Sequence, residues 1–181
     1  MIRRTIIISF FILFSTILQA QTLKPEPAEK ILTESLIKAK QDNKNVMIVF
    51  HASWCKWCKR LENAIESPEL KKIFTDNWVV TYVDVLERGK NADSLENQGG
   101  KELMKKFGGE KSGLPFCVFL NKKGSRICNS NLMPDKTNIG YPGTGDEIKL
   151  FTGMLKKSSK KLTTAQLAAI NDSLIKNAPQ Q

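Results

Sequence analysis

Residues Val46–Lys59 read VMIVFHASWCKWCK, and this stretch decides the fold. It opens with apolar residues, several of them β-branched or aromatic, directly after a polar segment at 43–45. That pattern predicts a buried strand. Beyond the second cysteine, Leu61, Ala64 and Ile65 recur on one helical face. We therefore expect the first cysteine in the first turn of a helix that leaves a buried strand.

That position gives the cysteines a chemical role. A helix N-terminus presents unpaired N–H groups and a partial positive charge, which stabilise a thiolate, the reactive form of cysteine. Lys56, Lys59 and Arg60 add positive charge near Cys55 and should favour the thiolate further. The two-residue spacing places Cys58 within reach of a mixed disulfide formed at Cys55.

These residues resemble the active site of the thioredoxin family. The resemblance rests on a hydrophobic strand followed by Trp54–Cys58, which reads WCKWC, and then a helix. It also rests on the segment 112–115, Ser-Gly-Leu-Pro, which precedes the apolar run 116–120. In thioredoxin-like folds a cis-proline opens the strand beside the active site, and Pro115 matches it. The resemblance covers roughly residues 28–157, and it looks closest to exported bacterial members with an insertion before that proline.

The resemblance implies an α/β protein of thioredoxin-like fold, a central mixed β-sheet flanked by helices. It also implies thiol–disulfide exchange with protein disulfide substrates, in which Cys55 is the nucleophile and Cys58 the resolving cysteine. No cofactor is needed, because the cysteines carry the redox equivalents. A reduced state outside the cytoplasm would need a partner such as a membrane electron donor. The alternative is a redox-silent binding or chaperone-like protein with a structural Cys55–Cys58 disulfide.

Four further residues are candidates for substrate binding. Trp54 matches the active-site tryptophan of the family and is expected beside Cys55. Trp57 stands in the variable dipeptide and would either add an apolar contact for the substrate or pack under a loop. Pro115 and the backbone around Leu114 would hold the substrate chain.

One departure from the family concerns proton transfer. Many thioredoxins carry a buried aspartate six residues before the first cysteine, where this chain has Val49. His51, two residues on, shares that strand face. We hypothesise that His51 tunes a cysteine pKa or relays a proton, the alternative being a partly buried histidine that only donates or accepts a hydrogen bond.

Other uses of the cysteine motif are disfavoured. A c-type haem needs histidine directly after the second cysteine, where Lys59 stands. A zinc site usually needs four ligands in paired clusters, and the remaining candidates are the scattered Cys117, Cys128 and the only histidine, His51. We expect no metal.

Cys117 and Cys128 lie on two short strands predicted at 116–120 and 125–130, joined by a hairpin turn. In a regular hairpin Cys117 faces Cys128, which leaves open either a disulfide or two separate buried thiols. Neither has a helix-terminus position, so neither is assigned a role in catalysis.

Residues 1–20 have the pattern of a signal peptide. Arg3 and Arg4 precede the apolar stretch 5–18, and Ala20 fits a cleavage position. The stretch is short for a membrane span. The sequence therefore predicts a periplasmic or secreted protein, with an uncleaved anchor as the alternative.

The remaining organisation follows from periodicity and turn residues. A lead-in at 21–27 should precede the thioredoxin-like domain, and 158–181 should form a helical extension beyond it. The loose stretch 86–112, with one helix inside it, reads mainly as a tolerated insertion near the active-site edge. The other elements are predicted as helices at 28–42, 67–76 (capped by Ser67), 99–107, 146–157 and 164–176 (capped by Thr163), and a strand at 78–85.

The formal net charge is +10, and the basic residues are spread along the chain. Small clusters stand at 122–123, 156–157 and 160–161. No nucleic-acid-binding motif accompanies them, so a nucleic-acid partner is disfavoured. A solvated basic surface is expected, which would favour acidic partners or an anionic membrane face.

Overall fold

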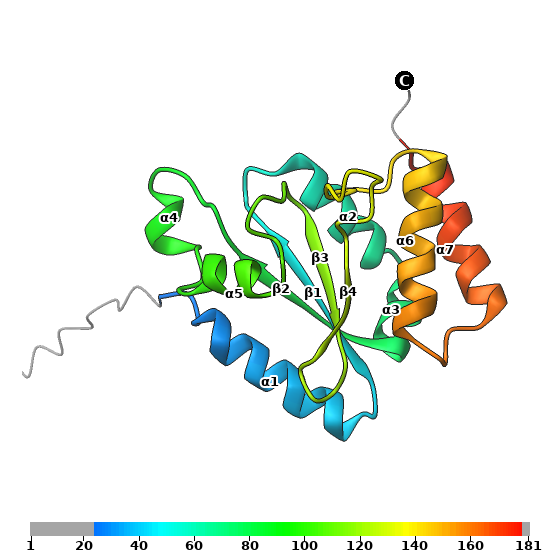
Figure 1. The fold of residues 1–181 in the computed structure, drawn as a ribbon, viewed down its shortest axis with the longest axis horizontal. Helices are drawn as coiled ribbons and strands as arrows, with labels where there is room; N and C mark the ends of the chain where they lie inside the picture. Colours follow the sequence, from blue (N-terminus) through cyan, green and yellow to red (C-terminus); the bar gives the residue numbers. More distant parts are fainter. Residues whose placement is uncertain (1–23, 179–181) are drawn as a thin grey trace, which may run out of the picture.

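The computed structural model describes residues 24–178. Seven helices and four strands follow in the described part of the chain, and Figure 1 shows their arrangement. The elements are α1 (Ala28–Gln41), β1 (Asn45–His51), α2 (Lys56–Ile65), α3 (Lys71–Asn77), β2 (Trp78–Asp84), α4 (Asn91–Ser94), α5 (Gly100–Lys106), β3 (Phe116–Leu120), β4 (Arg126–Asn129), α6 (Gly145–Ser158) and α7 (Thr164–Lys176).

The sheet is mixed, with the strand order β2-β1-β3-β4. β1 and β2 are parallel, and their register places Val49 beside Tyr82 and His51 beside Asp84. β3 runs antiparallel to both β1 and β4. The predicted central mixed sheet flanked by helices is confirmed.

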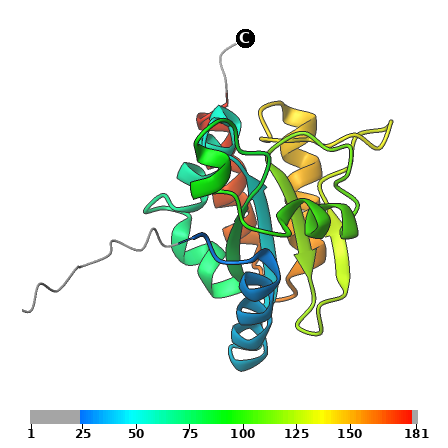
Figure 2. The same cartoon turned by 90° about the vertical axis from the view of Figure 1, so that its left-hand side faces the viewer.

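Successive side chains of β1 point to opposite faces of the sheet, and each face has its own core layer. Val46, Ile48 and Phe50 pack against α1 and α5 on one face. Met47 and Val49 point to the opposite face, where α2, α3, α6 and α7 cover the sheet. Figure 2, which looks from the side of α1, shows that helix lying along its face of the sheet. Because both faces of β1 are covered, the strand reads as a continuous apolar run.

The extra C-terminal helix is also present. α7 begins at Thr164 after a capping box, in which the Thr163 hydroxyl accepts from the backbone N–H of Gln166 and the Gln166 side chain accepts from that of Thr163. Ile170 and Leu174 of α7 join the core on the α6 side of the sheet. The extension is thus packed into the domain.

Two local predictions were wrong. α3 begins at Lys71, not at 67, because residues 67–70 form a turn that leads into the helix. Ser67 begins this turn: its carbonyl accepts from Lys71 N–H at 2.8 Å, and its hydroxyl accepts from Leu70 N–H at 3.3 Å, as expected of a capping residue. The hairpin register is shifted by one residue at the turn, where Leu120 faces Arg126, and by one more at an irregularity between Phe119 and Leu120, so that Phe119 rather than Cys117 faces Cys128.

The expected cleavage after Ala20 falls outside the described residues. Within residues 24–178, no helix is both long enough and apolar enough to cross a membrane.

Candidate active site

The cysteine pair lies at the N-terminus of α2, as predicted. Cys55 is the N-cap, and its Sγ accepts the backbone N–H of Cys58 at 3.1 Å. The two sulfurs form a disulfide with an S–S distance of 2.17 Å and a Cα–Cα distance of 5.2 Å. The same N–H group and the helix dipole would stabilise a thiolate on Cys55 once the disulfide opens.

Trp54 lies beside this helix start and is held by the insertion. Its indole Nε1 donates to the carbonyl of Leu86 at 2.8 Å, and the Arg88 guanidinium lies 3.7 Å from the centre of its ring. Glu87, which is buried, accepts from the Ser53 backbone N–H at 2.6 Å and from the Ser53 hydroxyl at 2.7 Å. The segment expected to be mainly a tolerated insertion therefore clamps the active-site loop. Charged residues inside a loose stretch were the only signal of this contact in the sequence.

Trp57 is 48% exposed and forms an aromatic pair that sequence analysis missed. Its ring stacks on Tyr141 with 5.8 Å between centroids, and the Arg60 guanidinium lies 5.8 Å from the Trp57 ring centre and 5.4 Å from that of Tyr141. Beyond α7, the carbonyl of Asn177 accepts from Arg60 at 2.7 Å and from the Tyr141 hydroxyl at 3.3 Å. We call Trp57, Arg60 and Tyr141 the aromatic platform. Tyr141 lies in a glycine-rich stretch, and nothing in the sequence of that stretch indicated a contact with Trp57.

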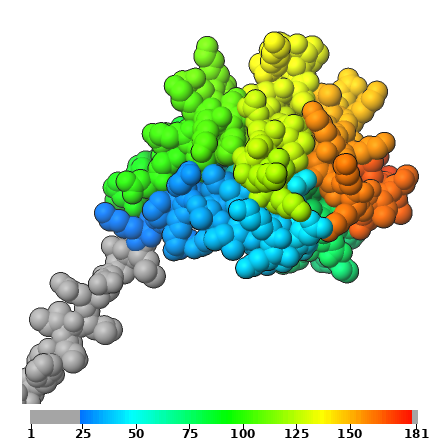
Figure 3. Space-filling model, turned by 60° about the horizontal axis from the view of Figure 1, so that its bottom comes forward, coloured from blue at the N-terminus to red at the C-terminus, as the bar shows by residue number. Residues whose placement is uncertain are grey.

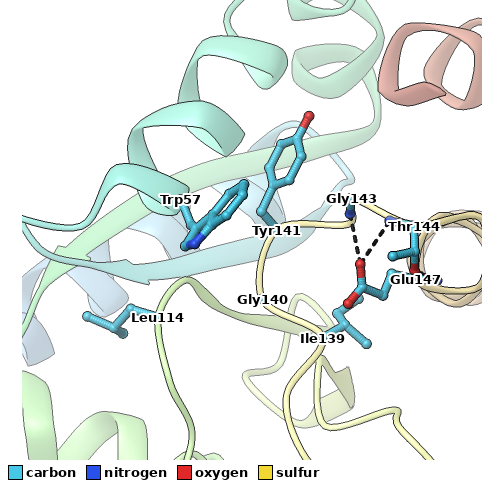
Figure 4. A pocket seen from close by; sticks show the side chains of 8 residues that line it. All are labelled: Trp57, Leu114, Ile139, Gly140, Tyr141, Gly143, Thr144 and Glu147. Atoms are coloured by element: carbon cyan, nitrogen blue, oxygen red, sulfur yellow. Dashed lines mark hydrogen bonds between the residues drawn. The ribbon is translucent and has the colours of Figure 1, made fainter. Parts of the chain in front are cut away.

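Leu114 connects the cysteines to an apolar pocket. Its side chain packs against the cluster formed by Ala52, Cys55 and Cys58. It also lines a pocket of about 360 Å³ next to Trp57. Figure 4 shows the pocket, with Trp57 and Tyr141 side by side on one wall and the carboxylate of Glu147 bonded to backbone N–H groups at the far end.

The Leu114–Pro115 peptide bond is cis, as the resemblance implied. The amide of Asn138 donates to the carbonyls of Gly113 at 2.7 Å and Pro115 at 2.8 Å. Asn138 therefore holds the backbone on both sides of Leu114, although the sequence did not single it out.

His51 lies on the sheet face that α2 covers, two residues beyond Val49. Its Nε2 is 3.3 Å from Oδ1 of Asp84, and its ring meets Tyr82 edge-on with centroids 5.3 Å apart. Burial raises the pKa of Asp84, as do Glu87 and Glu62, against the lowering effect of His51. Burial also raises the pKa of Tyr82, whose hydroxyl has no hydrogen-bond partner among the described residues. A histidine, a carboxyl and a phenol thus gather beneath the active-site helix.

Cys117 and Cys128 are free thiols, so the disulfide alternative is excluded. Burial raises the pKa of Cys117 to about 12. Burial likewise raises the pKa of Cys128 to about 11, although Lys157 opposes the shift. Both thiols stay protonated at neutral pH and act as small apolar residues.

Metal ligands do not gather in the described part of the chain, where no three His, Cys, Asp or Glu side chains form a group able to hold an ion.

Comparisons with known proteins agree with this geometry. A sequence profile described as thioredoxin-like matches residues 28–122, slightly more than half of the chain. The chain belongs to the thioredoxin-like family. Among curated proteins, none matches the sequence.

Several solved structures are similar to this chain at low sequence identity. A structure described as DsbH oxidoreductase is 21% identical, with a TM-score of 0.51 over 73% of this chain and 83% of that one. A disulphide isomerase from Xylella fastidiosa Temecula1 is 19% identical, with a TM-score of 0.49 over 82% of this chain and 89% of that one. A thioredoxin from Thermus thermophilus is 22% identical, with a TM-score of 0.42 over 60% and 74% respectively.

Proposed function

We propose that the protein is an exported thiol–disulfide oxidoreductase that exchanges disulfides with protein substrates. The observation that carries the proposal is the Cys55–Cys58 disulfide at the start of α2, with Cys55 as N-cap. Membership of the thioredoxin-like family supports it. A helix N-terminus is the environment in which a cysteine becomes a good nucleophile and a good leaving group.

In the reducing direction, the thiolate of Cys55 attacks one sulfur of a substrate disulfide. A mixed disulfide forms and the other substrate sulfur leaves as a thiolate, which takes up a proton. The thiolate of Cys58 then attacks Sγ of Cys55 and releases the second substrate sulfur. Two electrons have passed to the substrate, and the pair is oxidised. The reverse sequence donates the disulfide to a substrate dithiol.

The pocket beside the cysteines supplies a place for the substrate. An extended segment next to Leu114 and Pro115 would put its sulfur at Cys55 and a neighbouring apolar side chain against Trp57 and Tyr141. The pocket volume of about 360 Å³ is sufficient for one such side chain.

His51 is proposed as the residue that assists the second cysteine. The family's aspartate position is Val49, whereas His51 lies on the same face within 3.3 Å of the Asp84 carboxylate. Nε2 of His51 makes no hydrogen bond within residues 24–178, so it is available to take up a proton and pass it on. Replacing His51 by Ala should shift the pH dependence of the thiol–disulfide exchange rate and of the ultraviolet absorbance of the active-site thiolates. An unchanged profile would assign His51 a structural role only.

Export is part of the proposal and rests on the sequence of residues 1–20. N-terminal sequencing of the protein recovered from a Gram-negative host's periplasm tests it. A mature chain that begins near Gln21 supports export with cleavage, and recovery of intact Met1 from the cytoplasm contradicts it.

The exchange activity is tested by equilibrating the protein in glutathione buffers and following tryptophan fluorescence. A reversible transition near about −270 mV would indicate a reductant, and one at roughly −120 to −180 mV an oxidant or isomerase. Insulin reduction by wild type should be lost in Cys55→Ser and retained in Cys117→Ser. Equal activity of wild type and Cys55→Ser, or a disulfide that stays closed, would favour the redox-silent binding protein.

A further inference from the structure

Three lysine-bearing segments that are far apart in the sequence meet at one pocket. Its volume is about 540 Å³, and it lies where the segment before β1, the β3–β4 hairpin and the α6–α7 connection converge. Five lysines line it: Lys44, Lys122, Lys157, Lys160 and Lys161. Figure 3 shows the corresponding cyan, yellow-green and orange segments meeting on the underside of the molecule. We call this the lysine pocket.

The positive charge of the lysine pocket is hardly compensated. No carboxylate lines it. Of its five lysines only Lys44 has an ion pair within residues 24–178, with Asp42 at 3.5 Å. The pair is half-buried, and Asp42 lies 3.5 Å from Lys38 as well, so one carboxylate is shared by two lysines and leaves most of the positive charge of the pocket uncompensated.

Two of the ammonium groups are fixed by neutral oxygens. Nζ of Lys122 donates to Oδ1 of Asn43 at 2.7 Å, and Nζ of Lys161 donates to the carbonyl of Asn43 at 3.0 Å. These bonds orient the side chains without cancelling their charge. Each ammonium keeps two further N–H donors for another acceptor.

The neutral polar side chains at the lysine pocket are already hydrogen-bonded within the protein. The Ser159 hydroxyl donates to Oδ1 of Asn77 at 2.7 Å, and Nδ2 of Asn45 donates to the carbonyl of Ser158 at 2.7 Å. Nε1 of Trp78 donates to the Ser158 hydroxyl at 3.1 Å. Since these groups bond to each other, recognition at the pocket falls to the lysines, and an anion is the complementary ligand.

We propose that the lysine pocket binds a phosphate-bearing anion with at least two negative charges. A compact, multiply charged group can accept from several ammonium donors at once, and lysine acts as a point charge towards phosphate. The pocket volume accommodates a diphosphate or a lipid headgroup. β1 begins at this pocket and ends at His51 near the cysteines, which separates the two sites by roughly 20 Å. Binding there leaves the exchange site open.

The test compares two probes and two matched variants. Lys122→Gln/Lys157→Gln/Lys161→Gln removes three charges from the pocket. Lys24→Gln/Lys90→Gln/Lys111→Gln removes three charges from exposed lysines that do not line it. Pyrophosphate binding is measured by calorimetry in 50 mM salt. Membrane binding is measured by co-sedimentation with phosphatidylcholine vesicles, with and without 30% cardiolipin, whose headgroup carries two phosphates.

The pocket variant should weaken binding of at least one probe by more than about tenfold, while the control variant stays within about twofold of wild type. Loss confined to pyrophosphate identifies a soluble phosphate compound as the natural class of ligand. Loss confined to the cardiolipin vesicles identifies a lipid headgroup. If neither probe binds wild type, or if both variants lose affinity equally, the proposed site is refuted. Insulin reduction, measured alongside, should be equal in all three proteins and shows that the variants are folded.

Discussion

Replacing Glu87 by Ala should destabilise the protein through the active-site loop. The change removes the bonds of 2.6 and 2.7 Å that the buried carboxylate accepts from the Ser53 backbone and hydroxyl. Hydrogen bonds to a charged acceptor contribute about 1.5–3 kcal/mol each. Removing a buried carboxylate also relieves its desolvation, so we expect a net loss of about 2–3 kcal/mol.

The loss is measured by urea unfolding of the oxidised protein and by its melting temperature. For a domain of this size the expected decrease in Tm is roughly 5–10 °C. Glu69→Ala is the matched control, since it removes the same charge from an exposed position without an ion pair among the described residues. The free energy of unfolding of Glu69→Ala should be within about 0.5 kcal/mol of that of wild type. If Glu87→Ala unfolds as the control does, the two short bonds contribute nothing measurable and the clamp is not a stabilising feature.

Three further outcomes follow from burial and packing. Burial raises the pKa of Asp84 above the ordinary 3.8, so the folded state binds the carboxyl proton of Asp84 more tightly than the unfolded state, and the free energy of unfolding decreases as the pH rises above 3.8. Asp84→Asn should therefore be more stable than wild type to urea at pH 7 but not at pH 3.5. With pKa values raised to about 12 and 11, Cys117, which is buried, and Cys128, which is partly buried, should resist iodoacetamide at pH 8 in the native protein. Rapid labelling of either, detected by mass spectrometry, would contradict the raised pKa of that thiol. Gly109→Ala places a Cβ 2.6 Å from a phenylalanine ring carbon and should cost about 1–3 kcal/mol, whereas Gly153→Ala, in the open interior of α6, should stabilise by roughly 0.5–1 kcal/mol; thermal melts that rank them the other way would refute the packing argument.

Local patterns were sufficient to predict the main elements. The apolar run of β1 and the capping residue of α7 each mark their element within the chain, because burial and helix capping act over a few residues. The cysteine pair at the start of α2 followed from the same reasoning. The cis bond at Pro115 came from resemblance, since sequence spacing alone does not determine an isomer.

The contacts that complete the site depend on segments distant in the sequence. Glu87 contacts Ser53, which lies 34 residues away in the sequence, and Tyr141 contacts Trp57 across a still longer sequence separation. Neither partner has a local pattern that reveals it, because its environment exists only after the sheet has formed. The predicted hairpin register was wrong because the turn shifts the pairing by one residue and an irregularity between Phe119 and Leu120 shifts it by one more.

The bonds made by Asn177 have a practical consequence for handling the protein. Because the Asn177 carbonyl joins Arg60 and Tyr141, a polypeptide fused after Ala178 would leave the domain beside the aromatic platform. An affinity tag or fluorescent protein there would crowd the pocket beside the cysteines, which is the place proposed above for a substrate chain. Residues 24–27, which precede α1, lie towards α4 and α5 and away from α2 (Figure 1), so a fusion directly before them would leave that pocket clear. Turnover should therefore depend on which end carries the fusion, and a short flexible spacer after Ala178 should restore it.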